Sequence, residues 1–140
     1  MNDSTWTWIS GSKTVDFKGS YGDKGQASDT NAPGARLGAA VWYDSSTQEF
    51  WVFGGHENSG VILNSFNDLW RYRMNDSTWT WMSGSDTTDE PGVYGEKGVA
   101  NSTNVPGARW GAVGWYDRSR QEFWLFGGHG FGYDNSIDGA

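Results

Sequence analysis

Side chains that can clamp an acid or hold a metal ion occur in this 140-residue chain as two matched pairs. Arg36 and His56 return as Arg109 and His129, about 73 residues further along. A guanidinium can bind a carboxylate or sugar acid through paired hydrogen bonds, and imidazoles can bind a metal ion or an acidic group. In the structural alternative, arginine bonds to loop carbonyls and histidine to a loop beyond a diglycine. We favour the structural alternative for both pairs. Gly-Ala-Arg entering a strand suits it for the arginines, and no carboxylate recurs at ligand spacing beside the histidines.

A second matched set lies in a long Gly-containing segment, Ser10 to Pro33, where Tyr21 and Lys24 return later as Tyr94 and Lys97. Long connections without structure of their own are usually functional or disordered. The recurring Tyr-Gly and Lys-Gly pairs indicate a definite conformation, because Gly supplies unusual backbone angles. The scattered Asp residues lack the dense spacing of a calcium loop. We therefore predict ligand-binding residues with no metal and no cofactor. The candidates are Tyr21, Lys24, Arg36, His56, Tyr94, Lys97, Arg109 and His129.

Composition excludes several classes of protein. The absence of Cys removes disulfides, thiolate nucleophiles and cysteine metal sites, and no other catalytic constellation is visible. A net charge of −7 argues against nucleic acid as a partner. No apolar stretch approaches the roughly 18 residues of a membrane helix, and the first residues lack the character of a signal peptide. The compartment stays open. An aromatic content of 16% favours a folded domain over disorder.

The matched residues belong to an internal duplication. Met1 to Trp8 returns unchanged as Met74 to Trp81, and Gln48 to Trp51 returns as Gln121 to Trp124. Each repeat of this kind is one supersecondary unit that buries its faces against its neighbours. No segment has apolar residues at helical spacing, whereas short aromatic runs separated by turn-rich stretches indicate strands.

Four strands are predicted in each repeat. In the first repeat they cover residues 35–43, 49–54, 68–73 and 77–82. The short links between the first two and the last two are typical of an antiparallel meander. Side chains are small in the first strand and amphipathic in the last two. The second strand is apolar on both sides, so we expect both of its faces to be covered. A four-stranded sheet standing radially around an axis needs that order. The pattern therefore predicts β-propeller blades.

A combination of aromatic and glycine motifs marks the repeat: Trp51-Val52-Phe53, Gly54-Gly55, Asn67-Asp68-Leu69-Trp70, Tyr72 and Trp79, with Gly127-Gly128 and Trp6 in the other copy. On these residues the chain resembles the kelch-repeat family. One departure is the period, which is about 73 residues against roughly 50 for kelch repeats. Kelch propellers resemble that of galactose oxidase, whose copper-radical site uses a Tyr joined to a Cys. Without Cys, that chemistry does not carry over to any residue here.

The repeats divide the chain unevenly. We expect residues 1–9 to be the outer strand of a preceding blade, 35–83 a complete blade, and 108–140 the first two strands of the next. Because a propeller needs about four to eight blades to close, we expect these roughly two repeats to be part of a larger closed propeller. The alternative is a homo-oligomer in which several copies close a ring, if the chain is complete.

Strand direction alternates along a meander, so the long links at residues 10–33 and 57–66 are expected on one face, with all eight candidate residues. Long loops on a rigid scaffold commonly bind ligands. The leading hypothesis is a non-catalytic kelch-type module that binds a protein, or else a carbohydrate, through this face, with no nucleic acid and no membrane. One alternative is the propeller portion of a galactose-oxidase-like or other carbohydrate-active extracellular enzyme. Another is a structural propeller fragment, or an oligomer-closed assembly, without a ligand.

Overall fold

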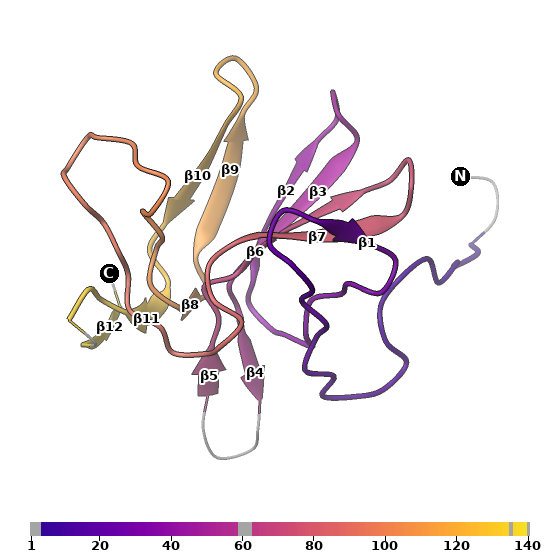
Figure 1. Ribbon diagram of the computed structural model, residues 1–140, viewed down its shortest axis with the longest axis horizontal. Coiled ribbons are helices and arrows are strands. Elements are labelled where there is room, and N and C mark those ends of the chain that lie inside the picture. Colours follow the sequence, from indigo (N-terminus) through magenta and orange to yellow (C-terminus); the bar gives the residue numbers. More distant parts are fainter. Residues whose placement is uncertain (1–3, 59–62, 135, 140) are drawn as a thin grey trace.

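The computed structural model describes residues 4–58, 63–134 and 136–139, which form antiparallel β-sheets and no helix (Figure 1). The predicted all-β class is confirmed. The strands are β1 (Ala27–Ser28), β2 (Ala40–Asp44), β3 (Glu49–Phe53), β4 (His56–Asn58), β5 (Leu63–Ser65), β6 (Leu69–Arg73), β7 (Thr78–Ser83), β8 (Arg109–Trp110), β9 (Val113–Asp117), β10 (Glu122–Phe126), β11 (His129–Phe131) and β12 (Ile137–Gly139). No helix that could span a membrane occurs in the described ranges.

The four predicted strands of the first repeat form one antiparallel meander. Strands β2, β3, β6 and β7 are hydrogen-bonded in chain order, and β1 adds to the outer edge of β7 (Figure 1). Register places Trp42 opposite Trp51, and Trp51 opposite Arg71. The long connection before the meander therefore contributes a fifth strand, which the sequence did not reveal.

The first strand begins later than predicted, at Ala40 and not at Ala35. Gly38 has φ +63°, a left-handed conformation that leaves the extended path of a strand. Leu37 instead exchanges two backbone hydrogen bonds of 2.9 Å with His56. The backbone turn at Gly38 thus separates the start of the repeat from the sheet.

The second repeat places its first two predicted strands as β9 and β10, which pair with each other. Its β8, β11 and β12 form a separate three-stranded sheet. The link after β3, expected as a loop, contains the β4–β5 hairpin, and β11–β12 is its counterpart in the second repeat.

Residues 4–9, expected as an outer strand, are assigned no strand, and Trp6 is 98% exposed. Their counterpart β7 is paired on both sides, with β6 and β1. Because a strand persists only where a neighbour satisfies its backbone groups, the same sequence forms a strand in one place and an irregular segment in the other.

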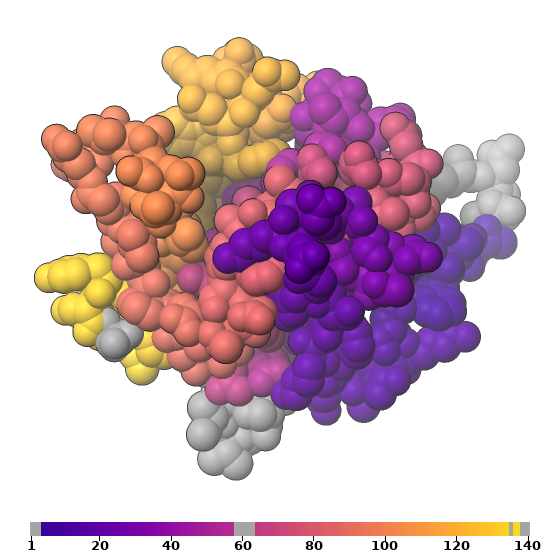
Figure 2. Space-filling model, in the orientation of Figure 1, coloured from indigo at the N-terminus to yellow at the C-terminus, as the bar shows by residue number. Residues whose placement is uncertain are grey.

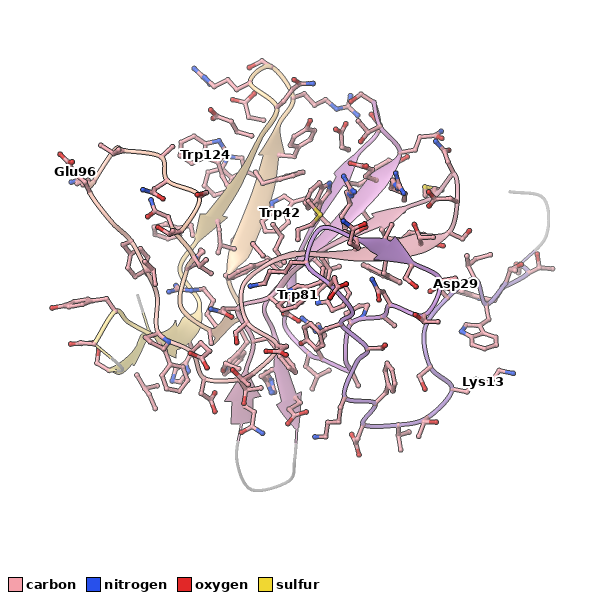
Figure 3. All side chains as sticks on the ribbon, viewed as in Figure 1. Lys13, Asp29, Trp42, Trp81, Glu96 and Trp124 are labelled. Atoms are coloured by element: carbon pink, nitrogen blue, oxygen red, sulfur yellow. The ribbon has the colours of Figure 1, made fainter. Side chains whose placement is uncertain are left out.

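The two repeats stack through one aromatic layer between their sheets. Trp42 and Phe53 are buried on one face of the first sheet, and Tyr116, Phe123 and Leu125 of β9 and β10 pack against them. The Trp42 and Phe123 ring centroids are 5.4 Å apart. Figure 3 shows Trp42 between β2 and β9, with Trp124 on the far side of the second sheet. Strands β2 and β9, the first long strand of each repeat, therefore lie against each other.

The expectation that both faces of the second strand are covered holds for one face only. Phe53 is buried, whereas Phe50 on the opposite face is 41% exposed. Val41 and Tyr43, which pair with β3 on that same face, are also exposed. A groove of about 550 Å³ on that side is lined by Phe50, Tyr72 and Trp79, and also by residues 7–11 and Pro33.

Asp44 links the two sheets and makes folding sensitive to acid. Its Oδ1 accepts hydrogen bonds from the hydroxyl and backbone N–H of Ser46, and its Oδ2 accepts one of 3.0 Å from Tyr116. The Ser46 hydroxyl, with smaller contributions from its N–H and from Tyr116, lowers the pKa of Asp44 from 3.8 to about 2.

We expect the stabilisation from Asp44 to be complete above about pH 4 and to be lost as the pH falls through 2, because the unfolded carboxyl takes up its proton first. Thermal unfolding of the wild type and of Asp44→Asn, measured from about pH 5 downward, should show a stability difference that shrinks with falling pH. Asp23→Asn, at an exposed loop position, serves as the control. A difference that stays constant with pH would contradict this assignment.

Candidate functional site

The two long links of the first repeat share one side of the molecule, as predicted. Lys18 in the first link forms a 2.8 Å ion pair with Glu57 in the second. Asp89, in the next long link, exchanges hydrogen bonds of 2.8 Å with the backbone of Ser65. In Figure 2 the orange segment near residue 100 projects from the side of the molecule opposite the N-terminal segment. The described residues of the successive long links (10–33, 57–66 and 84–107) thus contact one another. Together they form one surface, the loop-rich side.

In the first repeat this side is built on a buried carboxylate, Asp68. Arg36 holds it by two hydrogen bonds, from Nη1 to Oδ1 at 2.6 Å and from Nη2 to Oδ2 at 2.8 Å. The side chains of Arg36 and Asp68 are 8% and 0% exposed. Nε and Nη1 of Arg36 also donate to the carbonyls of Gly34 and Gly54. Arg36 is therefore a structural residue, as the favoured interpretation held, and it also has a buried acidic partner.

Tyr21 completes the same cluster. Its hydroxyl donates a 2.8 Å hydrogen bond to Asp68, and its ring packs 4.9 Å from Trp70 and 5.1 Å from Trp81. Burial, reinforced by the Asp68 carboxylate, raises the pKa of Tyr21 far above its usual range. The indole N–H of Trp70 also donates to Asp68, at 2.6 Å. Tyr21 thus remains a neutral donor inside the fold.

Asp68 and Trp70 are members of this cluster that reasoning from the sequence missed. Both belong to the Asn-Asp-Leu-Trp motif, which carried a family resemblance but no assigned role. One available signal was an acidic residue placed directly before an aromatic strand. Such a carboxylate has to be paired once the strand is buried.

In the second repeat, Arg109 makes the same contacts to glycine carbonyls as Arg36 but has a different side-chain partner. Nε and Nη1 of Arg109 donate to the carbonyls of Gly107 and Gly127, both at 3.0 Å, as Arg36 does to its own glycines. Nη2 donates to the hydroxyl of Tyr94 at 3.0 Å. Tyr94 is 48% exposed. Among the described side chains, no carboxylate is paired with Arg109.

The diglycine lets the two repeats approach closely. The N–H of Gly55 donates to the carbonyl of Arg109 at 2.8 Å, and Gly54 and Gly55 have φ values of +64° and +92°. A Cβ at Gly54 would lie 2.6 Å from that same carbonyl. Any larger residue there would push the Arg109 backbone away from the first repeat.

Both predicted histidines lie beside Trp110. His56 is buried, and its ring meets Trp110 edge-on with centroids 4.9 Å apart. His129 is exposed, and its ring is 5.7 Å from Trp110. No group of three metal-ligating side chains occurs in the ranges that the structure describes. Trp110 replaces Leu37 of the first repeat, and nothing in the sequence marked it as the residue that both imidazoles contact.

The two predicted lysines are exposed. Lys24 lies over the ring of Trp81 at 4.5 Å, a cation–π contact, while Lys97 lies on the projecting loop of the second repeat. A pocket of about 250 Å³ beside Arg36 and His56 is lined also by Asp16, Ala35 and Leu37. Of the eight candidates, Tyr21, Arg36 and His56 are held in structural contacts. The second-repeat candidates Tyr94, Lys97 and His129 are exposed, and Arg109 is half-buried.

No protein-family model matches this chain, and neither does any curated protein.

Proposed function

We propose that this chain is a non-catalytic kelch-type β-propeller module that binds an acidic segment of a partner protein on its loop-rich side. One observation carries the proposal: the half-buried Arg109 and the exposed Tyr94 repeat the arrangement by which Arg36 and Tyr21 hold the carboxylate of Asp68. A bidentate arginine with an adjacent hydroxyl is a strong and geometrically selective carboxylate binder.

The stacking of successive repeats supports the propeller part of this proposal. Inner strands β2 and β9 lie side by side, and Gly38 meets Gly111 through a 2.8 Å backbone hydrogen bond at the contact between repeats. Small residues at the inner contact are what a radial arrangement requires. Outer strands β7 and β1 lie away from that contact (Figure 1).

The free edge of β10 supports an extended segment as the ligand. In the first repeat β3 pairs with β2 on one side and β6 on the other, and β6 follows directly after Asp68. Within the described residues, β10 pairs with β9 alone. An extended partner can add to such an edge by main-chain hydrogen bonds while its side chains supply specificity. The acidic residue would enter the place that Asp68 takes in the first repeat.

The test uses a labelled peptide with the sequence of residues 65–73 and measures its fluorescence anisotropy with the intact chain. The only acidic residue of this peptide is Asp68, the carboxylate that Arg36 holds in the first repeat. Arg109→Gln is expected to weaken binding about tenfold or more, because a charged hydrogen-bonded pair is lost. Charge reversal at Lys97 should weaken binding less, with the sheet intact by circular dichroism.

A matched peptide with Asn in place of Asp68 should bind as weakly to the wild type as the original peptide binds to Arg109→Gln. Equal affinity of both peptides for the wild type would refute a carboxylate site. Equal affinity of the wild type and Arg109→Gln for the original peptide would refute the assignment to Arg109.

A further inference from the structure

Stacking between the two sheets of this chain is directional. The face of the first sheet that carries Trp42 and Trp51 packs on the face of β9–β10 that carries Tyr116 and Phe123. Counted in repeat positions, Trp42 corresponds to Trp115, and Tyr116 corresponds to Tyr43. The contact therefore joins one face of a repeat to the opposite face of the next, which is a head-to-tail arrangement.

Directional stacking leaves two complementary faces open. The tail face, on the outside of β9–β10, consists of Val113, Trp115, Trp124 and Phe126, which are 64%, 48%, 46% and 70% exposed. The head face, on the outside of the first sheet, consists of Val41, Tyr43, Phe50 and Val52. Three of these, Val41, Tyr43 and Phe50, are 64%, 42% and 41% exposed.

These faces occupy the same repeat positions as the two sides of the internal contact and are apolar like them. The tail face takes the positions of Ala40, Trp42, Trp51 and Phe53, and the head face takes the positions of Gly114, Tyr116, Phe123 and Leu125. Contiguous exposed apolar faces of this kind mark interaction sites. The internal contact shows what covers each of them.

We propose that copies of this chain associate head to tail, with the tail face of one copy packed on the head face of the next. The polar contacts at the edge of the internal interface have counterparts at the interface between copies. Within the chain, Tyr116 donates to Asp44 and Arg118 donates to Ser45. Between copies, Tyr43 takes the role of Tyr116 beside Asp117, and Arg118 meets Ser45 again.

One position sets the strength of this association. Gly114 lies under Trp42, and a Cβ there would be 2.7 Å from three atoms of the indole ring. Val41 occupies the corresponding position of the head face, opposite Trp115 on the tail face of the neighbouring copy. The Trp115 ring must shift to accommodate Val41, so the contact between copies is weaker than the contact within the chain.

This association involves a different surface from the loop-rich side, so it stands or falls independently of carboxylate binding. Sedimentation equilibrium of the purified chain should give a mass that rises with concentration above 15.5 kDa. Trp124→Asp on the tail face and Val41→Asp on the head face should each weaken association about tenfold or more. Val41→Gly should strengthen it several-fold. Val99→Asp, at a half-exposed loop residue, is the control that leaves the mass unchanged.

Mixing the two disruptive variants tests direction. Val41→Asp keeps its tail face and Trp124→Asp keeps its head face, so an equimolar mixture should form a one-to-one dimer that grows no further. Circular dichroism and melting temperature establish that each variant is folded. A wild-type mass that stays at 15.5 kDa at every concentration overturns the proposal. So does a mixture of folded variants that stays monomeric while the wild type associates.

Discussion

Replacing Asp68 with alanine is expected to lower the free energy of unfolding by about 3–5 kcal/mol, because the Arg36 guanidinium would remain buried without its counter-charge. Both side chains are almost fully buried, with Nη1–Oδ1 and Nη2–Oδ2 distances of 2.6 and 2.8 Å. The substitution also removes the acceptor for the Tyr21 hydroxyl and the Trp70 indole. Urea unfolding followed by tryptophan fluorescence measures the change.

Asp76→Ala is the matched control for this loss. Asp76 forms a 2.8 Å ion pair with Arg73, but the two side chains are 44% and 40% exposed. Exposed pairs of this kind contribute roughly 0–1 kcal/mol, so the control should change stability little. Equal losses for Asp68→Ala and Asp76→Ala would contradict the central role of the buried cluster.

The second large effect is expected at the aromatic layer between the repeats. Trp42 is 6% exposed and packs on Phe123 and on the backbone of Gly114. Trp42→Ala should reduce the free energy of unfolding by about 3–5 kcal/mol through lost apolar burial and the cavity that remains. Urea unfolding of the dilute protein is the measurement.

Trp115→Ala provides the comparison, because Trp115 occupies the same position of the second repeat and is 48% exposed. The loss there should be smaller by at least half, since much of that ring is already in water. If the two alanine variants lose the same stability, the assignment of Trp42 to an inter-sheet core is wrong.

The duplication and the strand pattern made the antiparallel meander predictable. Alternation in β6 and β7, and the tight links after Tyr43 and Arg73, are local features that a strand displays wherever it is placed. The bounds of β3 and β6 follow the prediction to within a residue. The late start of β2 did not follow, because the left-handed backbone at Gly38 ends the extended path of the strand there, and a glycine in a strand pattern does not by itself reveal such a turn.

The residue types of the candidate site were predictable from the sequence, but the partners of those residues were not. Arg36 and Tyr21 were recognisable by their recurrence, yet their common partner Asp68 lies 32 residues from Arg36 and 47 from Tyr21. Pairing of β3 with β6 brings these groups together, and local sequence does not encode that distance. The same is true of the two histidines, which contact one common ring because β8 places Trp110 beside both.

By itself, the sequence determined an all-β chain made of a repeated unit, because side-chain alternation and turn chemistry act over a few neighbouring residues. The tertiary structure alone decided which of two identical side chains is buried. Met1 to Trp8 and Met74 to Trp81 are the same eight residues, yet only the second copy, at Thr78 to Trp81, lies in a strand, flanked by β6 and β1. Burial and backbone pairing are properties of neighbours in space, and a sequence shared by two positions cannot distinguish them.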